Sequence, residues 1–465
     1  MEQRTIEFVA DACGGRLVAG RPGCLIRRVC TDSRTVRAGD LFVALAGRRF
    51  DAHSFLPEVA SKGASGVLIE RNQAVESLRD CAVILAANTR RALGTLAARY
   101  RSEFSLPVIA VGGSNGKTTT KELLAAVLRQ KLATLWSQAS FNNDIGVPLT
   151  LLRLETAHQV AILELGTNHP GELAPLMDMT GPHYGIITSI GREHLEFFGD
   201  LAGVALEEGV IAERLPAEGK LFLNGDSEWA GPIAARTRAP VVRVGFGDAN
   251  DWKIRWVRTD KQGARFRVES ARPEYEGEYR INLLGKHQAV NATFAIALGA
   301  ELGLNRAEIV RGLSECTPSA MRMELWEHNG IRVLDDAYNA NADSMMAALQ
   351  TLRDLPCKGR RIAVLGDMAE LGAHSEAAHY EVGRHAADMG IAQLIAVGTM
   401  ASVIAQGARE GGLNRVFEFP NVEAAAIAVK QFVREGDMVL LKASRASGLE
   451  QIADMLRTGE PGRKN

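Results

Sequence analysis

The chain has 465 residues, of which 46% are hydrophobic and 23% are charged, and its formal net charge is -1. This length predicts about three domains, and the balanced charge argues against nucleic acid or an anionic membrane surface as a partner. The six cysteines form no C-x-x-C pair, no apolar signal core follows Met1, and no apolar run approaches the roughly 18 residues of a membrane-spanning helix. We therefore expect a globular cytoplasmic protein without integral membrane association.

Residues 1–100 are predicted to form an N-terminal α/β domain. Apolar runs at 40–45 and 66–69 predict two of its strands. Residues 90–101 predict a helix, which a connector ending at Pro107 links to the next domain.

A central domain is expected over residues 101–316, with a parallel, doubly wound sheet, because buried-type strands alternate with helices after Pro107. An alternating pattern over 241–284 predicts an antiparallel patch at the edge of this domain, and a helix over 287–302 closes it. The predicted strands are 108–111, 160–165, 185–189 and 220–224.

The last part of the chain, residues 317–465, repeats the α/β rhythm and predicts a third, Rossmann-like domain. A polar tail over 457–465 is expected to be loose. The predicted strands are 331–334, 361–365, 393–397 and 438–441, each followed by an amphipathic helix.

The run from Val108 to Glu122 predicts a strand, a glycine-rich turn and a helix that begins near Lys117. Backbone N–H groups in such a turn, backed by a helix N-terminus, bind anions. Lys117 is then placed to reach the β- and γ-phosphates of a nucleotide, and the Thr118 hydroxyl is placed to bind the accompanying Mg²⁺. The strict phosphate-loop pattern has glycine where this chain has Val111, so the loop is a shortened variant that starts at Gly112. A glycine turn before a helix is also a common structural device. The order of strand, loop, lysine and threonine favours a nucleotide site.

Two further polar residues follow predicted strands of the same sheet. Glu164 ends the strand 160–165, and His194 lies in the loop after 185–189, so both are expected at the sheet edge that carries the phosphate loop. Glu164 is a candidate Mg²⁺ ligand or water anchor, and His194 a candidate metal or phosphate ligand. Alternatively, Glu164 is a solvated strand-end carboxylate, His194 an ordinary surface histidine, and Glu208 an exposed helix glutamate.

The run Asp335–Asn341, D-D-A-Y-N-A-N, follows the strand 331–334. Its aspartates and asparagines suit contacts to ribose, phosphate or an amine. They equally suit a helix N-cap, for which Asp343 is a candidate.

Together these motifs resemble the Mur ligase family, and the resemblance covers essentially the whole chain. Leu365–Gly372, L-G-D-M-A-E-L-G, is the most discriminating of them. With Asp335–Asn341 it separates this chain from family members that add earlier residues and from folylpolyglutamate synthases. The other matching segments are Thr31–Arg34, Gly39–Leu45, Asp51–His53, Phe141–Leu149, Gly285–His287 with Asn291, and Lys442–Arg445, where the family motif is Lys-Gly-Ser-Arg.

The resemblance implies a three-domain α/β ligase that uses ATP and Mg²⁺. Its expected substrates are UDP-N-acetylmuramoyl-tripeptide and D-alanyl-D-alanine, joined through an acyl phosphate. The expected domains are a UDP-binding domain (1–100), a phosphate-loop ATPase domain (101–316) and a Rossmann-like ligase domain (317–465). Ligases of this kind often work as monomers, so we expect a monomer.

The resemblance also assigns roles to individual residues. Catalytic roles fall to Lys117, Glu164, His194 and Arg322. The expected ATP site comprises Gly112, Gly113, Ser114, Asn115, Gly116, Lys117, Thr118, Thr119, His287, Asn291, Arg322 and Asp336. Metal ligands are expected at Thr118, Glu164, His194 and Glu208, UDP contacts at Asp32, Ser33 and Arg34, and contacts on the acceptor side at Asn142, Asn143, Tyr338, Asn339 and Asn341.

Three positions depart from the family pattern. Glu208 stands where the family has a lysine carbamylated by CO₂, and its side chain is shorter by about 3–4 Å. We therefore expect Glu208 to be a CO₂-independent substitute, with the helix lying closer, a water bridging the gap, or the second metal held differently. Ala342 replaces a frequent proline, which is expected to be harmless. Ala443 replaces a glycine and is expected to crowd a close approach of backbone and ligand.

Two alternatives remain open at the level of sequence. The first is a related ligase with a different amino-acid acceptor. The second is a non-catalytic nucleotide-binding homologue, which only Glu208 and Ala443 favour.

Overall fold

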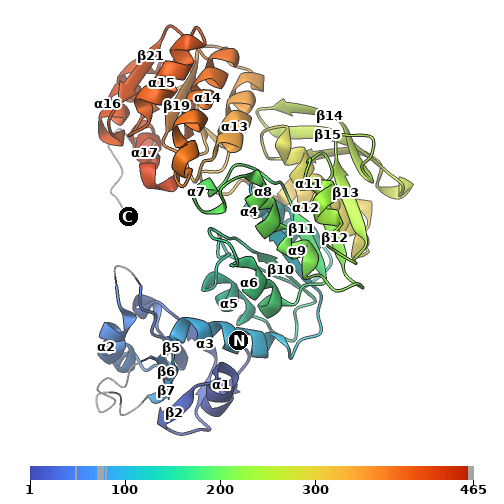
Figure 1. Cartoon of the computed structure of the whole chain (residues 1–465), viewed down its shortest axis with the longest axis vertical. Helices are drawn as coiled ribbons and strands as arrows, with labels where there is room; N and C mark the ends of the chain where they lie inside the picture. Colours follow the sequence, from blue (N-terminus) through green and yellow to red (C-terminus); the bar gives the residue numbers. More distant parts are fainter. Residues whose placement is uncertain (48–49, 71–77, 79–80, 459–465) are drawn as a thin grey trace.

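Three α/β bodies follow one another along the chain, each with its own sheet (Figure 1). The computed structural model describes residues 1–47, 50–70, 78 and 81–458. The predicted polar tail lies outside this range apart from its first two residues. None of the helices in the described part of the chain has the length and apolar character needed to cross a bilayer.

The N-terminal body contains a five-stranded sheet in the order β2-β7-β6-β5-β4. β2 is antiparallel to β7 and the other neighbours are parallel. The predicted strands at 40–45 and 66–69 are confirmed. The elements are β1 (Arg4–Thr5), α1 (Ile6–Cys13), β2 (Arg16–Ala19), β3 (Leu25–Ile26), β4 (Arg28–Cys30), β5 (Asp40–Val43), α2 (Leu56–Ser61), β6 (Gly66–Ile69), β7 (Ala82–Leu85) and α3 (Thr89–Arg101).

The central body contains a nine-stranded sheet in the order β16-β15-β14-β13-β12-β11-β8-β10-β9. Its strands are β8 (Val108–Gly112), β9 (Thr134–Trp136), β10 (Val160–Glu164), β11 (Tyr184–Ile187), β12 (Lys220–Asn224), β13 (Val241–Gly245), β14 (Trp252–Asp260), β15 (Gly263–Ser270) and β16 (Gly277–Ile281). Its helices are α4 (Lys117–Leu128), α5 (Gly146–Leu151), α6 (Leu173–Thr180), α7 (Leu195–Phe198), α8 (Leu201–Glu208), α9 (Val210–Glu213), α10 (Ala230–Ala234), α11 (His287–Glu301) and α12 (Arg306–Glu315).

The phosphate-loop strand β8 lies inside this sheet, between β10 and β11, and all five of its residues are buried. Burial on both faces explains its uninterrupted apolar sequence. The predicted antiparallel patch is confirmed for β14, β15 and β16. Its predicted start at residue 241 is wrong, because β13 pairs in parallel with both β12 and β14.

The C-terminal body contains a six-stranded sheet in the order β17-β18-β22-β19-β20-β21, parallel except for the edge strand β17. The four predicted strands are confirmed, whereas β17 and β21 were not predicted. The elements are β17 (Glu324–His328), β18 (Ile331–Asp335), α13 (Ala342–Asp354), β19 (Arg361–Gly366), α14 (Ser375–Asp388), β20 (Gln393–Val397), α15 (Ala401–Glu410), β21 (Val416–Phe419), α16 (Val422–Phe432), β22 (Met438–Lys442) and α17 (Glu450–Thr458).

The N-terminal and central bodies share one hydrophobic core, because α3 packs against α5 and α6. A second core, built by α4, α11 and α12, covers the opposite face of the central sheet. The C-terminal sheet has a core on each face. The loop after β18 contacts the loop after β8 through Asn341 and Asn115, and Glu164 at the end of β10 lies beside the same loop.

Candidate active site

The loop between β8 and α4 has a backbone that requires glycine at two positions. Gly113 has a φ of 105° and Gly116 a φ of 90°, in the left-handed region that disfavours other residues. A Cβ atom at Gly113 would lie 2.5 Å from Thr188 Oγ1, and one at Gly116 would lie 2.6 Å from Asn291 Oδ1. The helix α4 begins at Lys117, as predicted, so its N-terminal N–H groups face the loop.

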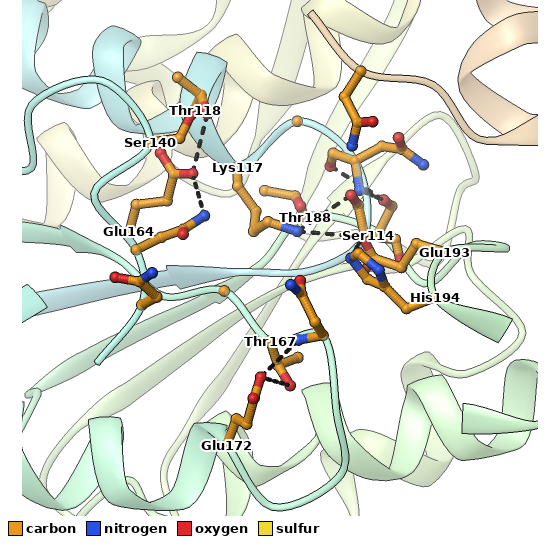
Figure 2. Close-up of a pocket in the computed structure, with 18 of the residues that line it drawn as sticks. Ser114, Lys117, Thr118, Ser140, Glu164, Thr167, Glu172, Thr188, Glu193 and His194 are labelled. Carbon is orange, nitrogen blue, oxygen red and sulfur yellow. Dashed lines mark hydrogen bonds and ion pairs between the residues drawn. The ribbon is translucent and has the colours of Figure 1, made fainter. Parts of the chain in front are cut away.

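Lys117 extends its ammonium group over this loop. It donates to backbone carbonyls of the loop, including Ser114 O at 3.3 Å, and lies 3.4 Å from Glu193 Oε2. Burial alone would lower the pKa of Lys117, but the negative charges of Glu193, Glu208 and Glu164 outweigh burial and raise this pKa. The cation is therefore held where an incoming phosphate can replace the carbonyls. Figure 2 shows it between the Thr118 and Glu193 sides of the pocket.

Glu164 is the last residue of β10 and lies next to the first turn of α4. It is only 1% exposed, so it is not a solvated strand-end carboxylate. Its Oε1 accepts hydrogen bonds from Thr118 Oγ1 at 3.1 Å and from Asn142 Nδ2 at 3.0 Å (Figure 2). Its buried Oε2 accepts no hydrogen bond, although Lys121 Nζ lies 3.6 Å away.

This donor set fits Mg²⁺, which takes one or two protein oxygens and completes its octahedron with phosphate and water. The described residues contain no cluster of three or more His, Cys, Asp or Glu that could hold a metal. Thr118 and Glu164 would therefore supply only part of the coordination.

Glu208, at the C-terminal end of α8, lies behind the phosphate loop. It is fully buried, so it is not an exposed helix glutamate, and it is absent from the cavity lining. Its Oε2 accepts the N–H of Gly113 at 2.6 Å, whereas its Oε1 has no hydrogen-bond partner. Burial raises the pKa of Glu208 to about 8, against the opposing charge of Lys117.

His194 lies at the junction of the central and C-terminal bodies. It has a left-handed φ of 49° at the start of α7. Its Nδ1 contacts the carboxylate of Glu370 from the third body, and its Nε2 lies 4.0 Å from Glu193 Oε2. His194 is therefore a contact between domains as well as part of the cavity wall.

The start of α13 also contacts the phosphate loop. Asn341 caps this helix by accepting the N–H of Ser344 at 2.9 Å, and its Nδ2 donates to Asn115 Oδ1 at 3.0 Å. The predicted cap at Asp343 is wrong, because that residue lies inside the first turn and binds the Arg192 guanidinium at 2.8 Å. The backbone puts Asn341 one step before the helix, where its side chain accepts a free N–H group of the first turn.

All three bodies line one cavity of about 1700 Å³. The central body contributes the loop residues 114–119, with Asn142, Asn143, Glu164, His194, His287 and Asn291; the C-terminal body contributes Arg322, Asp336, Tyr338, Asn339 and Asn341; and α3 contributes residues such as Arg90 and Arg91. Burial lowers the pKa of His287 to about 4, so its ring is neutral.

Some predicted site residues lie elsewhere. Asp32, Ser33 and Arg34 form part of a short turn in the N-terminal body outside the cavity lining, with Arg34 paired to Asp32 at 2.8 Å. Gly112 and Gly113 form the base of the loop.

Ala443 is fully buried, and its methyl group lies against Gly366, where an added Cβ would be 2.8 Å away. The methyl therefore packs inside the third body, away from the cavity.

Many of the cavity residues were not predicted as site residues, among them Ser140, Glu193 and Lys442. Ser140 lies in a loop whose sequence shows no chemical pattern, whereas Glu193 directly precedes His194 in a loop that was already a candidate site. Lys442 belongs to a segment that matched the family, and its position at the end of a predicted strand was the available signal.

A phosphate loop beside a buried carboxylate, faced by cations from another domain, defines a multidomain nucleotide-binding enzyme. Family models agree: the Mur ligase middle domain matches residues 111–299, the Mur ligase glutamate ligase domain matches 321–445, and the Mur ligase family catalytic domain matches 25–101.

Similar proteins cover the whole chain. The UDP-N-acetylmuramoyl-tripeptide–D-alanyl-D-alanine ligase of Escherichia coli (strain K12) is 36% identical over 97% of this chain and 98% of its own. The crystal structure of MurF from Acinetobacter baumannii is 32% identical, with a TM-score of 0.89 over 98% of this chain and 99% of that chain. MurF ligase from Thermotoga maritima in complex with ADP is 25% identical, with a TM-score of 0.81 over 92% and 97%.

This chain belongs to the Mur ligase family. It is an ATP-dependent acid–amino-acid ligase with the three-domain α/β fold of that family.

Proposed function

We propose that this ligase joins D-alanyl-D-alanine to UDP-N-acetylmuramoyl-tripeptide, which yields the pentapeptide precursor of peptidoglycan with ADP and phosphate. The observation that carries the proposal is that all three bodies line one shared cavity, whose lining includes both the phosphate loop and Arg322. It is supported by similarity to ligases of that name along the full chain.

The reaction requires activation of a carboxylate, which is a poor electrophile. Transfer of the γ-phosphoryl group of ATP to the carboxylate oxygen of the tripeptide gives an acyl phosphate and ADP. The amine of the dipeptide attacks the acyl carbon, a tetrahedral intermediate forms, and phosphate leaves as the amide forms. ATP and the tripeptide carboxylate are both anions. Lys117 therefore lowers the barrier by compensating their charges, and Arg322 does so from the third body.

Thr118 and Glu164 are the proposed protein ligands of Mg²⁺, and His194 and Glu208 are candidates for a second ion. When bound, Mg²⁺ supplies positive charge that screens the phosphate oxygens. Glu208 would have to release the Gly113 N–H before it could turn a carboxylate oxygen toward the cavity. The geometry therefore favours Thr118 and Glu164 as the principal ligands.

Residues 1–100 are proposed to bind the UDP substrate through Asp32, Ser33 and Arg34, 101–316 to bind ATP, and 317–465 to complete the ligase site. Among the remaining contacts, Asn142, Asn143, Tyr338, Asn339 and Asn341 are proposed to hold the peptide substrates, and His287 and Asn291 the nucleotide. The protein is proposed to be a cytoplasmic monomer. Contacts between Asn115 and Asn341 and between His194 and Glu370 hold the third body against the second, which shields an acyl phosphate from water.

The test measures phosphate release with ATP, Mg²⁺, UDP-N-acetylmuramoyl-tripeptide and D-alanyl-D-alanine, with each component omitted in turn. Release that requires all four, with a pentapeptide product by mass, is the expected result. Release with another amino acid in place of the dipeptide would identify a different acceptor. Tight ATP binding without release under any combination would identify a non-catalytic homologue.

A further inference from the structure

Arg322 crosses from the third body to the phosphate side of the cavity. Its guanidinium lies 4.1 Å from the centre of the Tyr338 ring and donates to Ser140 Oγ at 3.3 Å. Ser140 Oγ is 3.5 Å from Thr118 Oγ1, which donates to Glu164. One hydroxyl group therefore separates Arg322 from the proposed Mg²⁺ ligands (Figure 2 shows Ser140 beside Thr118 and Glu164).

The backbone on both sides of Arg322 is strained. Met321 has a φ of 56° and Met323 a φ of 53°, a region that long side chains rarely occupy. Such residues persist only where surrounding contacts enforce their conformation. Two left-handed residues around one arginine indicate that its position is held from outside the segment.

Asp336 and Lys442 supply that constraint. Asp336 Oδ1 accepts the N–H of Met323 at 3.0 Å, and Oδ2 accepts from Lys442 Nζ at 2.5 Å. Lys442 is 2% exposed and also donates to Asn339 O at 3.1 Å. A buried cation keeps its carboxylate partner, because separating them leaves a charge without compensation.

The sheet of the third body fixes the positions of both Asp336 and Lys442. Lys442 is the last residue of β22, and the neighbouring strand β18 ends at Asp335, paired with Leu441. The N–H of Asp336 donates to the carbonyl of Leu441 at 2.9 Å. The strands thus place the ammonium and carboxylate groups, and the carboxylate places Met323 and with it Arg322.

We propose that Asp336 and Lys442 are positioning residues that hold Arg322 in its place over the phosphate loop. Both oxygens of Asp336 accept hydrogen bonds from groups of the third body, and through Met323 the carboxylate affects the place of Arg322. This inference rests on the proposed function, because the place of Arg322 matters only if phosphoryl transfer occurs there.

The test is a double-mutant cycle. Asp336→Asn leaves one acceptor oxygen for two donors, and Lys442→Met removes the cation at similar volume. Each is expected to lower kcat about tenfold or more in the wild-type background and less than about twofold when Arg322→Ala is already present. The dissociation constant of ADP, measured by calorimetry, is expected to change less than about twofold, because Asp336 and Lys442 act through Arg322 on the transferred phosphoryl group, which ADP lacks.

Asp437→Asn is the matched control. Asp437 is 3% exposed in the side chain and pairs with Arg360 at 2.6 Å in the same body, outside the cavity lining. It is expected to lose stability without loss of kcat. Lys442→Arg, which retains the cation, is expected to recover most of the activity lost in Lys442→Met.

Two results would overturn the proposed positioning role. The first is that Asp336→Asn or Lys442→Met lowers kcat by the same factor with and without Arg322→Ala. The second is that Asp336→Asn weakens the affinity for ADP about tenfold. If Asp336→Asn does not fold, the Lys442 variants complete the cycle alone. Failure of the proposed function is separate, since the wild type would then release no phosphate with all four components.

Discussion

Replacement of Glu208 by glutamine is expected to make the stability of the protein less dependent on pH. The carboxyl group is fully buried behind the phosphate loop, with one oxygen on the Gly113 N–H and the other without a partner. Burial raises its pKa from 4.5 to about 8, although Lys117 opposes that change and Glu193 adds to it. Folding therefore favours the protonated form of Glu208.

The sign follows from proton binding. Between pH 4.5 and 8 the unfolded chain releases this proton and the folded chain keeps it, so the wild type loses stability as pH rises through that window. At about 1.4 kcal/mol per pH unit, the loss at pH 7 reaches at most about 3.5 kcal/mol. Glutamine has no proton to release. Its buried amide adds a penalty of about 1–3 kcal/mol that is the same at every pH.

Urea unfolding of both forms from pH 5 to 9 measures the difference. The variant is expected to gain on the wild type as pH rises to about 8 and then to remain level. Glu207→Gln is the matched control, because it replaces the neighbouring buried carboxylate by an amide. Glu207 accepts the N–H groups of Gly171 and Leu173, one on each oxygen, and glutamine retains only one acceptor oxygen. Parallel curves for Glu208→Gln and the wild type would refute the reasoning and show that Glu208 is ionised in the folded protein.

Three other perturbations have defined outcomes. Lys117→Met removes the loop cation and is expected to lower kcat by about 10²–10³ with little change in the unfolding midpoint, as measured by phosphate release and urea titration. Gly113→Ala places a Cβ 2.5 Å from Thr188 Oγ1 at a φ of 105°, and calorimetry is expected to detect no ATP binding at concentrations that saturate the wild type. Burial raises the pKa of Asp335 to about 6 from 3.8, so the wild type loses stability as pH rises between those values. Asp335→Asn is therefore expected to raise the melting temperature at pH 7.5 but not at pH 3.5, and an equal change at both would contradict this.

The strands that form the sheets could be predicted because they are buried on both faces. The run at 108–111 is apolar throughout and 220–224 has an apolar centre at 221–223, and the structure places both strands within one residue of the predicted ends. β17 and β21 could not be predicted in this way. They are edge strands with intermediate or exposed residues, so their sequences carry no such run.

The local chemistry of the site could be predicted from the amino-acid sequence. The order of strand, glycine turn, Lys117 and Thr118 is a local pattern, because neighbouring residues build the loop and the helix N-terminus. Glu164 was also within reach of sequence, since parallel strands end at one edge of a sheet.

The contacts of Glu208, Asp336 and Lys442 could not be predicted, because they depend on the packing of distant segments. Glu208 meets Gly113 across 95 residues of chain, and Lys442 meets Asp336 across 106. Such contacts depend on how helices and strands pack, which no local pattern records. The same packing places Asp336, which also lines the cavity, against Met323 beside Arg322.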